Sequence, residues 1–405
     1  MNNEVVFAAA GNGKTYSICK RAKNAVNSGN KCVLLLSYTN EGIRSLEKEY
    51  RKQNNGVLDD RIVVKSWYSF LLSEFIKPYQ CLLKLKGNRH KNEYPVTLPE
   101  NFVKSIAFYE TELPARYFNQ THVQYYVNRS GDVVPDRTSC LAILCNVHSG
   151  GKAVARMERI YSHVLVDELQ DYAGWDLEII KLLFESQLQV LCVGDYKQAT
   201  YRTNNAQKNS QYRDEKIRDY FAMLARKDLC SVSYANTTRR FNQEICDFIN
   251  TIHADEDAII SPEPNVEQET HQDNIGVYLI DLKYLNEYCD YYRPVILRYD
   301  KNAKIGFQHE CDVFNYGGAK GATFERTVII PVSTTLPFIK KQTQISSNQT
   351  RSKFYVACTR AKLSVVIAMD MPKENDVFKA TELRFADNVI PALKFTKVCQ
   401  GKEKC

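Results

Sequence analysis

The residues from Ala8 to Thr15 read A-A-A-G-N-G-K-T and stand between a short hydrophobic run and an amphipathic stretch. A strand, a glycine-bearing loop and a helix start are the setting in which backbone N–H groups bind phosphate. We expect the N–H groups from Asn12 to Lys14 to surround a β-phosphate, with Lys14 reaching the β- and γ-phosphates and the Thr15 hydroxyl joining a Mg²⁺ shell. Ala8 replaces the first glycine of the usual pattern, which the loop tolerates if Ala8 keeps a negative φ. A G-K-T run at a helix start also arises by chance, so the loop needs a second signal.

Two adjacent carboxylates supply that second signal. The hydrophobic run from His163 to Val166 leads directly into Asp167 and Glu168. Open α/β sheets bind ligands at the carboxyl ends of their strands. We therefore expect Asp167 to hold Mg²⁺ through water, and Glu168 to accept a proton from the attacking water. Such acids are also often only solvated or cap a helix, but together with the loop they predict a nucleoside triphosphatase.

A glutamine follows the next hydrophobic run. Val190 to Val193 leads into G-D-Y-K-Q-A-T-Y, from Gly194 to Tyr201. At that sheet edge Gln198 can donate to a γ-phosphate or orient water while staying neutral. We therefore assign Gln198 to the catalytic group.

These side chains need parallel strands that end at one edge, and the sequence predicts such strands. Short β-branched and leucine runs recur at 5–7, 32–36, 61–64, 163–166, 189–193, 276–280, 294–298, 327–331 and 364–369. Stretches with helical spacing lie between several of them, as at 15–28, 41–53 and 174–186. Buried strands that alternate with helices predict an α/β fold with two doubly wound parallel sheets. We place the first domain at 1–230 and the second at 231–405, with an insertion at about 78–151 that offers only short helical patches.

The composition fits a globular protein of two to three domains. The chain has 405 residues, of which 44% are apolar and 25% charged, and this balance excludes a wholly disordered chain. The net charge of +7 permits a polyanionic partner without requiring one. Thirteen dispersed cysteines without a C-x-x-C pair predict reduced thiols. No run reaches the roughly 18 apolar residues of a membrane span, so we expect a cytoplasmic protein without a membrane segment.

In their order along the chain and in their residues, these motifs resemble those of the UvrD/Rep-type superfamily 1 helicases. D-E-L-Q-D at 167–171 and the run at 194–201 are similar to the second and third motifs of that family. Further similar segments are L-S-Y-T-N-E at 36–41, K-S-W-Y-S-F at 65–70, T-R-R-F at 238–241 with the helix pattern at 244–250, A-K-G-A-T-F-E at 319–325 and F-Y-V-A-C-T-R-A-K at 354–362. The resemblance spans nearly the whole chain and implies two RecA-like domains in tandem, with a small insertion in the first.

The resemblance implies a set of residues that bind and hydrolyse ATP with Mg²⁺. Arg240 and Arg360 would reach from the second domain to the γ-phosphate, where an arginine fork stabilises developing negative charge. Arg239 remains the rival of Arg240 for this role. The ATP-binding set is Ala10, Gly11, Asn12, Gly13, Lys14, Thr15, Lys320 and Gly321.

The resemblance also implies that single-stranded DNA crosses both domains opposite the nucleotide. Aromatic rings suit this task, because stacking on a base contributes about 1–3 kcal/mol without sequence preference. Hydroxyl and amide side chains can bind the phosphates. The residues assigned to this track are Tyr38, Thr39, Asn40, Ser66, Trp67, Tyr68, Phe70 and Tyr201.

Departures from the family pattern leave several functional alternatives open. Gly317 stands where the family has histidine and Thr323 where a glutamate commonly holds the ribose, so the choice of ATP over GTP is open. One alternative is a motor that moves 3′ to 5′ along single-stranded DNA. A second is an ATPase that senses DNA ends for a partner, since compact chains of this type resemble the helicase-like subunit of Gabija antiphage systems, which works beside an OLD-type nuclease. A third is an RNA-directed member of a related branch.

Overall fold

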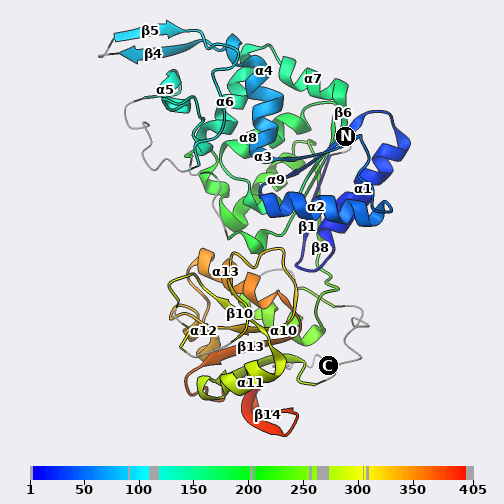
Figure 1. Cartoon of the computed structure of the whole chain (residues 1–405), viewed down its shortest axis with the longest axis vertical. Helices are drawn as coiled ribbons and strands as arrows, with labels where there is room; N and C mark the ends of the chain where they lie inside the picture. The colour runs from blue at the N-terminus through cyan, green and yellow to red at the C-terminus, as the bar shows by residue number, and fades with distance from the viewer. Residues whose placement is uncertain are drawn as a thin grey trace. The chain divides into compact units, whose positions relative to one another are not determined.

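The structure is a computed structural model of the chain. It describes residues 3–89, 92–108, 118–200, 204, 206–254, 258–261, 273–303, 305–306 and 310–397. The chain forms two compact units. The first comprises Met1–Phe7, Lys14–Tyr196 and Arg202–Ser233, and the second comprises Ala8–Gly13, Lys197–Tyr201 and Tyr234–Cys405. Both are α/β units built on a sheet with parallel strands, as the sequence predicts (Figure 1).

The first unit contains a six-stranded sheet in the order β3-β2-β6-β7-β1-β8. The pairs β3/β2, β2/β6, β6/β7 and β7/β1 are parallel. The strands are β1 (Glu4–Ala8), β2 (Cys32–Ser37), β3 (Ile62–Ser66), β6 (Tyr161–Val166), β7 (Gln189–Gly194) and β8 (Ser231–Ala235). Every strand predicted in this half of the sequence is therefore present.

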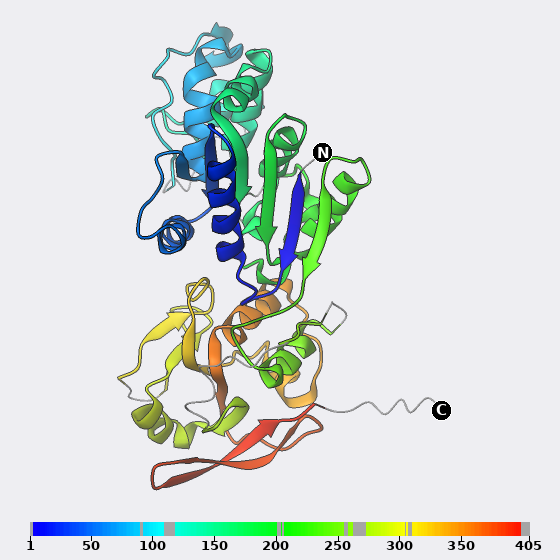
Figure 2. The same ribbon diagram turned by 90° about the vertical axis from the view of Figure 1, so that its right-hand side faces the viewer.

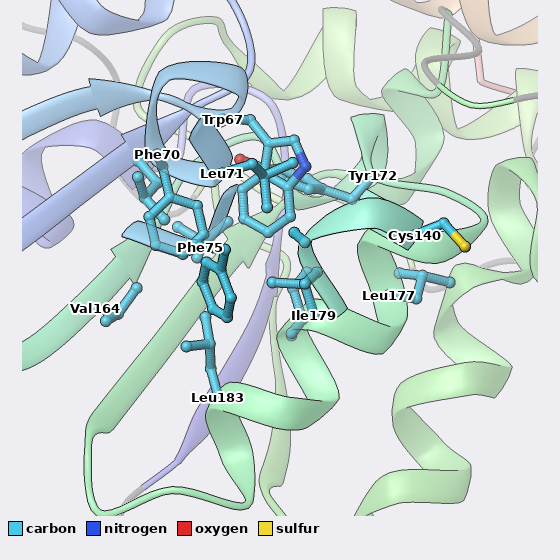
Figure 3. Close-up of a cluster of buried hydrophobic side chains, with 14 of the residues drawn as sticks. Trp67, Phe70, Leu71, Phe75, Cys140, Val164, Tyr172, Leu177, Ile179 and Leu183 are labelled. Atoms are coloured by element: carbon cyan, nitrogen blue, oxygen red, sulfur yellow. The ribbon is translucent and has the colours of Figure 1, made fainter. Parts of the chain in front are cut away.

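Helices cover both faces of this sheet, because alternate strand residues point to opposite sides. On one face, α1 (Lys14–Ser28) and α2 (Asn40–Gln53) bury Val33, Leu35 and Leu165. The opposite face packs against α3 (Trp67–Phe70), α6 (Pro135–His148), α8 (Trp175–Phe184) and α9 (Ile217–Ala225). Figure 3 shows the centre of this second core, where Val164 of β6 lies near Phe70, Phe75 and Leu183.

The inserted region at 78–151 is more helical than the sequence indicates. It holds the hairpin β4 (Leu85–Arg89) and β5 (Asn92–Val96), the short helix α5 (Val123–Tyr126) and the 14-residue helix α6. The expectation of only short helical patches was therefore wrong at α6. A π-helical turn at Leu71–Ile76 and the turn α4 (Lys77–Tyr79) lead into the inserted region, and α7 (Lys152–Ile160) follows it.

The second unit contains a seven-stranded sheet in the order β11-β10-β12-β13-β9-β15-β14. Its strands are β9 (Gly276–Asp281), β10 (Val295–Arg298), β11 (Val313–Asn315), β12 (Phe324–Ile329), β13 (Ala361–Met369), β14 (Phe378–Phe385) and β15 (Asn388–Phe395). The first five strands in the order are mutually parallel. β15 pairs antiparallel with both β9 and β14, so the red hairpin of Figure 2 makes this sheet mixed at one side.

Two cores hold the second unit together, one on each face of its sheet. α10 (Gln243–Ile252), α12 (Leu336–Lys341) and α13 (Asn348–Cys358) contribute to the core with Leu279 and Ile367. α11 (Leu285–Tyr292) covers the face that carries Ile296 and Val366. Within the described residues, no helix is both long and apolar enough to cross a membrane. None of the cysteines in the described ranges forms a disulfide, and most of them are buried.

Candidate functional site

Two glycines with positive φ shape the phosphate loop between β1 and α1. Gly11 has a φ of 78° and Gly13 a φ of 91°, a region that residues with a side chain rarely adopt. The Asn12 N–H donates to the Ala9 carbonyl at 3.2 Å, and this bond closes the turn before α1 begins at Lys14. Ala8 has no positive φ, so the condition for its replacing glycine is met.

Within the second unit, loop residues 8–13 pack against residues 237–240. The Asn12 side-chain amide donates to the carbonyl and to the hydroxyl of Thr237, both at 3.0 Å. The Arg239 N–H donates to the Gly11 carbonyl at 3.1 Å. A Cβ at Gly11 would lie 2.6 Å from the Cβ of Arg240. Glycine is therefore needed at position 11 for close approach as well as for its backbone angle.

Asp167 and Glu168 follow β6 at the carboxyl edge of the first unit's sheet. The Asp167 N–H donates to the Leu36 carbonyl of the neighbouring strand at 2.8 Å, and its side chain is buried. One carboxylate oxygen of Asp167 accepts the Glu168 N–H at 2.9 Å. Glu168 has a φ of 55°, and strained backbone of this kind in non-glycine residues clusters at functional sites.

Gln170 was not singled out from the sequence, yet it connects two of the motifs. Its side-chain N–H donates to the Glu168 carboxylate, and its side-chain oxygen accepts the Asp195 N–H at 2.8 Å. Gln170 is buried. A Cβ at Gly194, the last residue of β7, would lie 2.6 Å from that same oxygen. Gln170 thus fixes the Glu168 carboxylate to the end of β7, and its only signal in the sequence is its place in D-E-L-Q-D.

The start of α1 and the two acids share one edge of the first unit's sheet. Lys14 and Thr15 open the helix that follows β1, and Asp167 directly follows β6. Only β7 separates β1 from β6. At a strand spacing of about 4.8 Å, the two strand ends lie about 10 Å apart.

In the second unit, Gln198 lies next to Arg360, and both side chains are buried. The Arg360 guanidinium contacts the Gln198 side-chain oxygen at 3.5 Å and donates to the Thr359 hydroxyl at 2.9 Å. Further guanidinium N–H groups donate to the Val356 and Ala322 carbonyls. These contacts hold the Arg360 side chain in one orientation inside the unit.

Arg240 reaches the same region, whereas the side chain of Arg239 is exposed. The Arg240 guanidinium donates to the Thr359 carbonyl at 2.9 Å, directly beside Arg360. The turn that carries Lys320 and Gly321 also adjoins Arg360, because the Phe324 N–H donates to the Arg360 carbonyl at 2.9 Å. Gly321 has a φ of 83°. The second unit therefore brings together the loop at 8–13, Gln198 and the two arginines.

The residues predicted to hold Mg²⁺ are one hydroxyl, of Thr15, and one carboxylate, of Asp167. Within the described ranges there is no group of three or more His, Cys, Asp or Glu side chains that could hold a metal ion. Mg²⁺ is commonly bound by one or two carboxylates together with substrate phosphates and water. The donor set of Thr15 and Asp167 fits that mode.

The predicted DNA contacts at Trp67 and Phe70 are contradicted by the structure. Both rings are fully buried in the first unit's core, where no base can stack on them. The Trp67 indole packs edge-on against Tyr172 at 4.7 Å between ring centroids (Figure 3). Its N–H donates to the Asp176 carboxylate at 2.9 Å. The four residues W-Y-S-F do not by themselves reveal which of the three rings face inward.

Asp176 is a fully buried acid beneath the Trp67 ring. Burial raises the pKa of this carboxyl group from 3.8 to about 6, against the opposing effect of hydrogen bonds from Ser139 and Trp67. One oxygen accepts both of these bonds, and the other has no hydrogen-bond partner in the described part of the chain. The Trp67 side chain is thus anchored by a polar contact deep in the core.

The other residues predicted to bind DNA remain nearer the surface. The Tyr38 hydroxyl donates to that of Tyr68 at 2.7 Å. The Thr39 and Ser66 hydroxyls cap α2 and α3 by accepting backbone N–H groups, and Asn40 is exposed at the start of α2. Tyr201, the last member of the predicted track, lies outside the described residues. The DNA contacts of the exposed members stay predictions.

Comparison with known proteins gives a family match for part of the chain. Residues 65–217 match the family model for the UvrD/REP helicase N-terminal domain. A comparison with curated proteins gives no match. Among solved structures, the arterivirus nonstructural protein 10 helicase is similar at 13% identity with a TM-score of 0.43, covering 91% of this chain and 59% of that one. The same arterivirus helicase in complex with DNA gives 13% identity and a TM-score of 0.42, covering 92% of this chain and 62% of that one. This chain thus spans less than two thirds of either arterivirus chain.

Proposed function

We propose that this chain is a UvrD-like helicase of superfamily 1, which hydrolyses ATP with Mg²⁺ and moves along single-stranded DNA. The match over residues 65–217 supports the family part of this proposal. The observation that carries this proposal is the shared sheet edge in the first unit. There, the start of α1 and the acids after β6 are two strand spacings apart. A separation of about 10 Å suits a triphosphate whose β-phosphate lies at the helix start and whose γ-phosphate faces the acids.

The first unit supplies the groups that bind phosphate and activate water. Lys14 would contact the β- and γ-phosphates as a point charge. Thr15 and Asp167 would hold Mg²⁺, which supplies charge neutralisation at the phosphates. Glu168 would accept a proton from the attacking water, with its carboxylate oriented by the N–H of Gln170.

The second unit supplies the groups for the γ-phosphate. Arg360 and Arg240 would stabilise the charge that builds up there during hydrolysis. Their guanidinium groups are oriented by neighbouring carbonyl and hydroxyl groups, most directly those of Thr359. Gln198 would report the presence of the γ-phosphate, because its side-chain oxygen already contacts Arg360.

The test is the ATPase rate of the full chain with single-stranded DNA, single-stranded RNA, blunt duplexes and tailed duplexes. The Glu168→Gln variant serves as the control for contaminating activity. We expect single-stranded DNA to stimulate the ATPase rate. We also expect the protein to displace a strand, or a protein bound to the DNA, from a tailed substrate. If DNA ends stimulate the ATPase rate without any movement along DNA, the result would favour an ATPase that senses DNA ends. If RNA stimulates the rate more than DNA does, it would favour the RNA-directed branch. A wild-type rate no higher than that of Glu168→Gln would refute the proposal.

A further inference from the structure

A pocket of about 740 Å³ opens at the amino ends of the strands in the second unit's sheet. It lies beside the end of α11 and the first residues of β10, β12 and β13. None of its lining residues belongs to the predicted ATP or DNA sites. A volume of this size accommodates a small organic ligand. The lining residues that matter here are Asp273, Tyr291, Tyr292, Arg293, Phe324, Glu325 and Arg326.

Arg326 places a buried positive charge in the wall of the pocket. Its side chain is only 7% exposed. Its guanidinium donates to the carbonyls of Asp273 at 2.6 Å and Asn274 at 3.1 Å, and to the Ser364 hydroxyl at 3.1 Å. All of these acceptors are neutral, and no carboxylate within the described residues forms an ion pair with Arg326. A buried guanidinium stays ionised, and buried charges are normally balanced by an opposite charge. An anionic ligand would supply that balance.

Aromatic rings form the walls beside this charge. The Arg326 guanidinium lies over the Tyr292 ring, 4.2 Å from its centroid. Tyr291 also lines the pocket, and 49% of its surface is exposed although it is a large ring. Phe324 contributes a partly exposed ring from β12. An exposed tyrosine ring and a partly exposed phenylalanine ring beside an arginine are surroundings in which proteins bind nucleobases by stacking.

The backbone at Arg293 is unusual for its residue type. Arg293 ends α11 with a φ of 44° and directly precedes Pro294. Helices usually place glycine or asparagine in this left-handed conformation. An arginine there brings a second cation to the rim of the pocket, where it pairs with the exposed Glu310. The acids that line the pocket, Asp273 and Glu325, are both exposed to solvent. Among the described lining residues, the buried charge is therefore the positive one of Arg326.

We propose that this pocket binds a nucleoside monophosphate unit, with the phosphate at Arg326 and the base on Tyr291. The unit is either a free nucleotide or the 5′-phosphorylated end of a strand, since both offer the same base and phosphate. The site is separate from the phosphate loop and stands whether or not the proposed ATPase activity is found.

The first experiment is calorimetric titration of the full chain with 5′-AMP and dTMP. Monophosphates lack the β-phosphate that the phosphate loop is expected to bind, so they report on the new site. In parallel, fluorescence anisotropy compares a labelled oligonucleotide with and without a 5′-phosphate. Binding of the free monophosphates, or tighter binding of the phosphorylated strand, supports the proposal and identifies which source is used.

Variants then locate the binding. Tyr291→Ala should weaken binding about tenfold through lost stacking, and Arg326→Gln should weaken it at least tenfold through the lost charge. Arg384→Gln is the matched control, because the guanidinium of this exposed arginine of the same unit forms an ion pair with the exposed Glu382 and does not line the pocket. Arg326→Gln also removes hydrogen bonds to the backbone carbonyls of Asp273 and Asn274, and this loss can prevent folding. In that case Tyr291→Ala still tests the proposal. The proposal is overturned if neither probe binds wild type, or if Tyr291→Ala binds as tightly as Arg384→Gln.

Discussion

Replacing Asp176 by asparagine should remove a pH-dependent penalty from the stability of the first unit. Burial raises the pKa of this carboxyl group from 3.8 to about 6. In the unfolded chain the group returns to about its ordinary value. Between roughly pH 4 and pH 6 the folded state therefore binds more protons than the unfolded state, so this group makes stability fall as pH rises. A difference of about two pKa units corresponds to about 3 kcal/mol, all of it present above pH 6.

The prediction concerns a difference between two proteins, so other titrating groups cancel. The unfolding free energy of Asp176→Asn minus that of wild type should rise by about 3 kcal/mol from pH 3.5 to pH 7.5. Loss or gain of a hydrogen bond by the new amide shifts this difference by a constant and leaves its pH dependence unchanged. The change of this free-energy difference with pH, rather than its value at one pH, therefore tests the raised pKa of Asp176.

Urea unfolding followed by tryptophan fluorescence is a suitable assay. The chain has two tryptophans, Trp67 and Trp175, and both lie in the first unit. Trp67 donates directly to Asp176, so its emission reports on the affected core. The control is Asp219→Asn, which changes an exposed acid in the first turn of α9, as Asp176 lies in the first turn of α8. A difference for Asp176→Asn that stays flat with pH, like that of the control, would refute the reasoning.

Three further predictions concern hydrolysis. Glu168→Gln should lower steady-state ATP turnover at least a hundredfold and leave ATP affinity within a few-fold, since only the proton acceptor is lost; turnover at the wild-type rate would contradict this. Lys14→Ala should raise the dissociation constant for a fluorescent ATP analogue about 10- to 100-fold, because it removes charge-assisted bonds to phosphate; an unchanged constant would exclude that contact. Gln170→Leu should lower kcat about tenfold with little change in KM, because Gln170 positions the Glu168 carboxylate without touching substrate; equal effects on both constants, or none, would remove the positioning role.

The sequence predicts the strands and the sheet edge well because their signals are local. A buried parallel strand is a nearly continuous apolar run, rich in leucine in β2 and in β-branched residues in β13. The acids Asp167 and Glu168 directly follow such a run, so the order of residues along the chain was enough to predict their place at the end of β6. The glycines at 11 and 13 are equally local, since both have the positive φ that favours glycine.

Features that depend on distant contacts could not be predicted in this way. α6 buries Thr138, Ser139 and Asn146 along with its apolar residues, so no clear apolar face marks it in the sequence. The inward orientation of Trp67 depends on Asp176, which lies 109 residues later. Gln170 likewise acquires its role from the Asp195 N–H at the end of a different strand.

These distant contacts also connect the acids to the segment that begins α3. Tyr172 follows the turn that carries Glu168 and Gln170, and its ring is fully buried. That ring packs edge-on against Trp67 and against Tyr38, with centroids 4.7 Å and 5.5 Å away. Because a packed core has little free volume, a shift of the acid-bearing turn displaces its aromatic neighbours as well. The buried Trp67 ring therefore packs between the acid-bearing turn and the core beneath residues 66–70, and its contacts are with protein side chains rather than with bases.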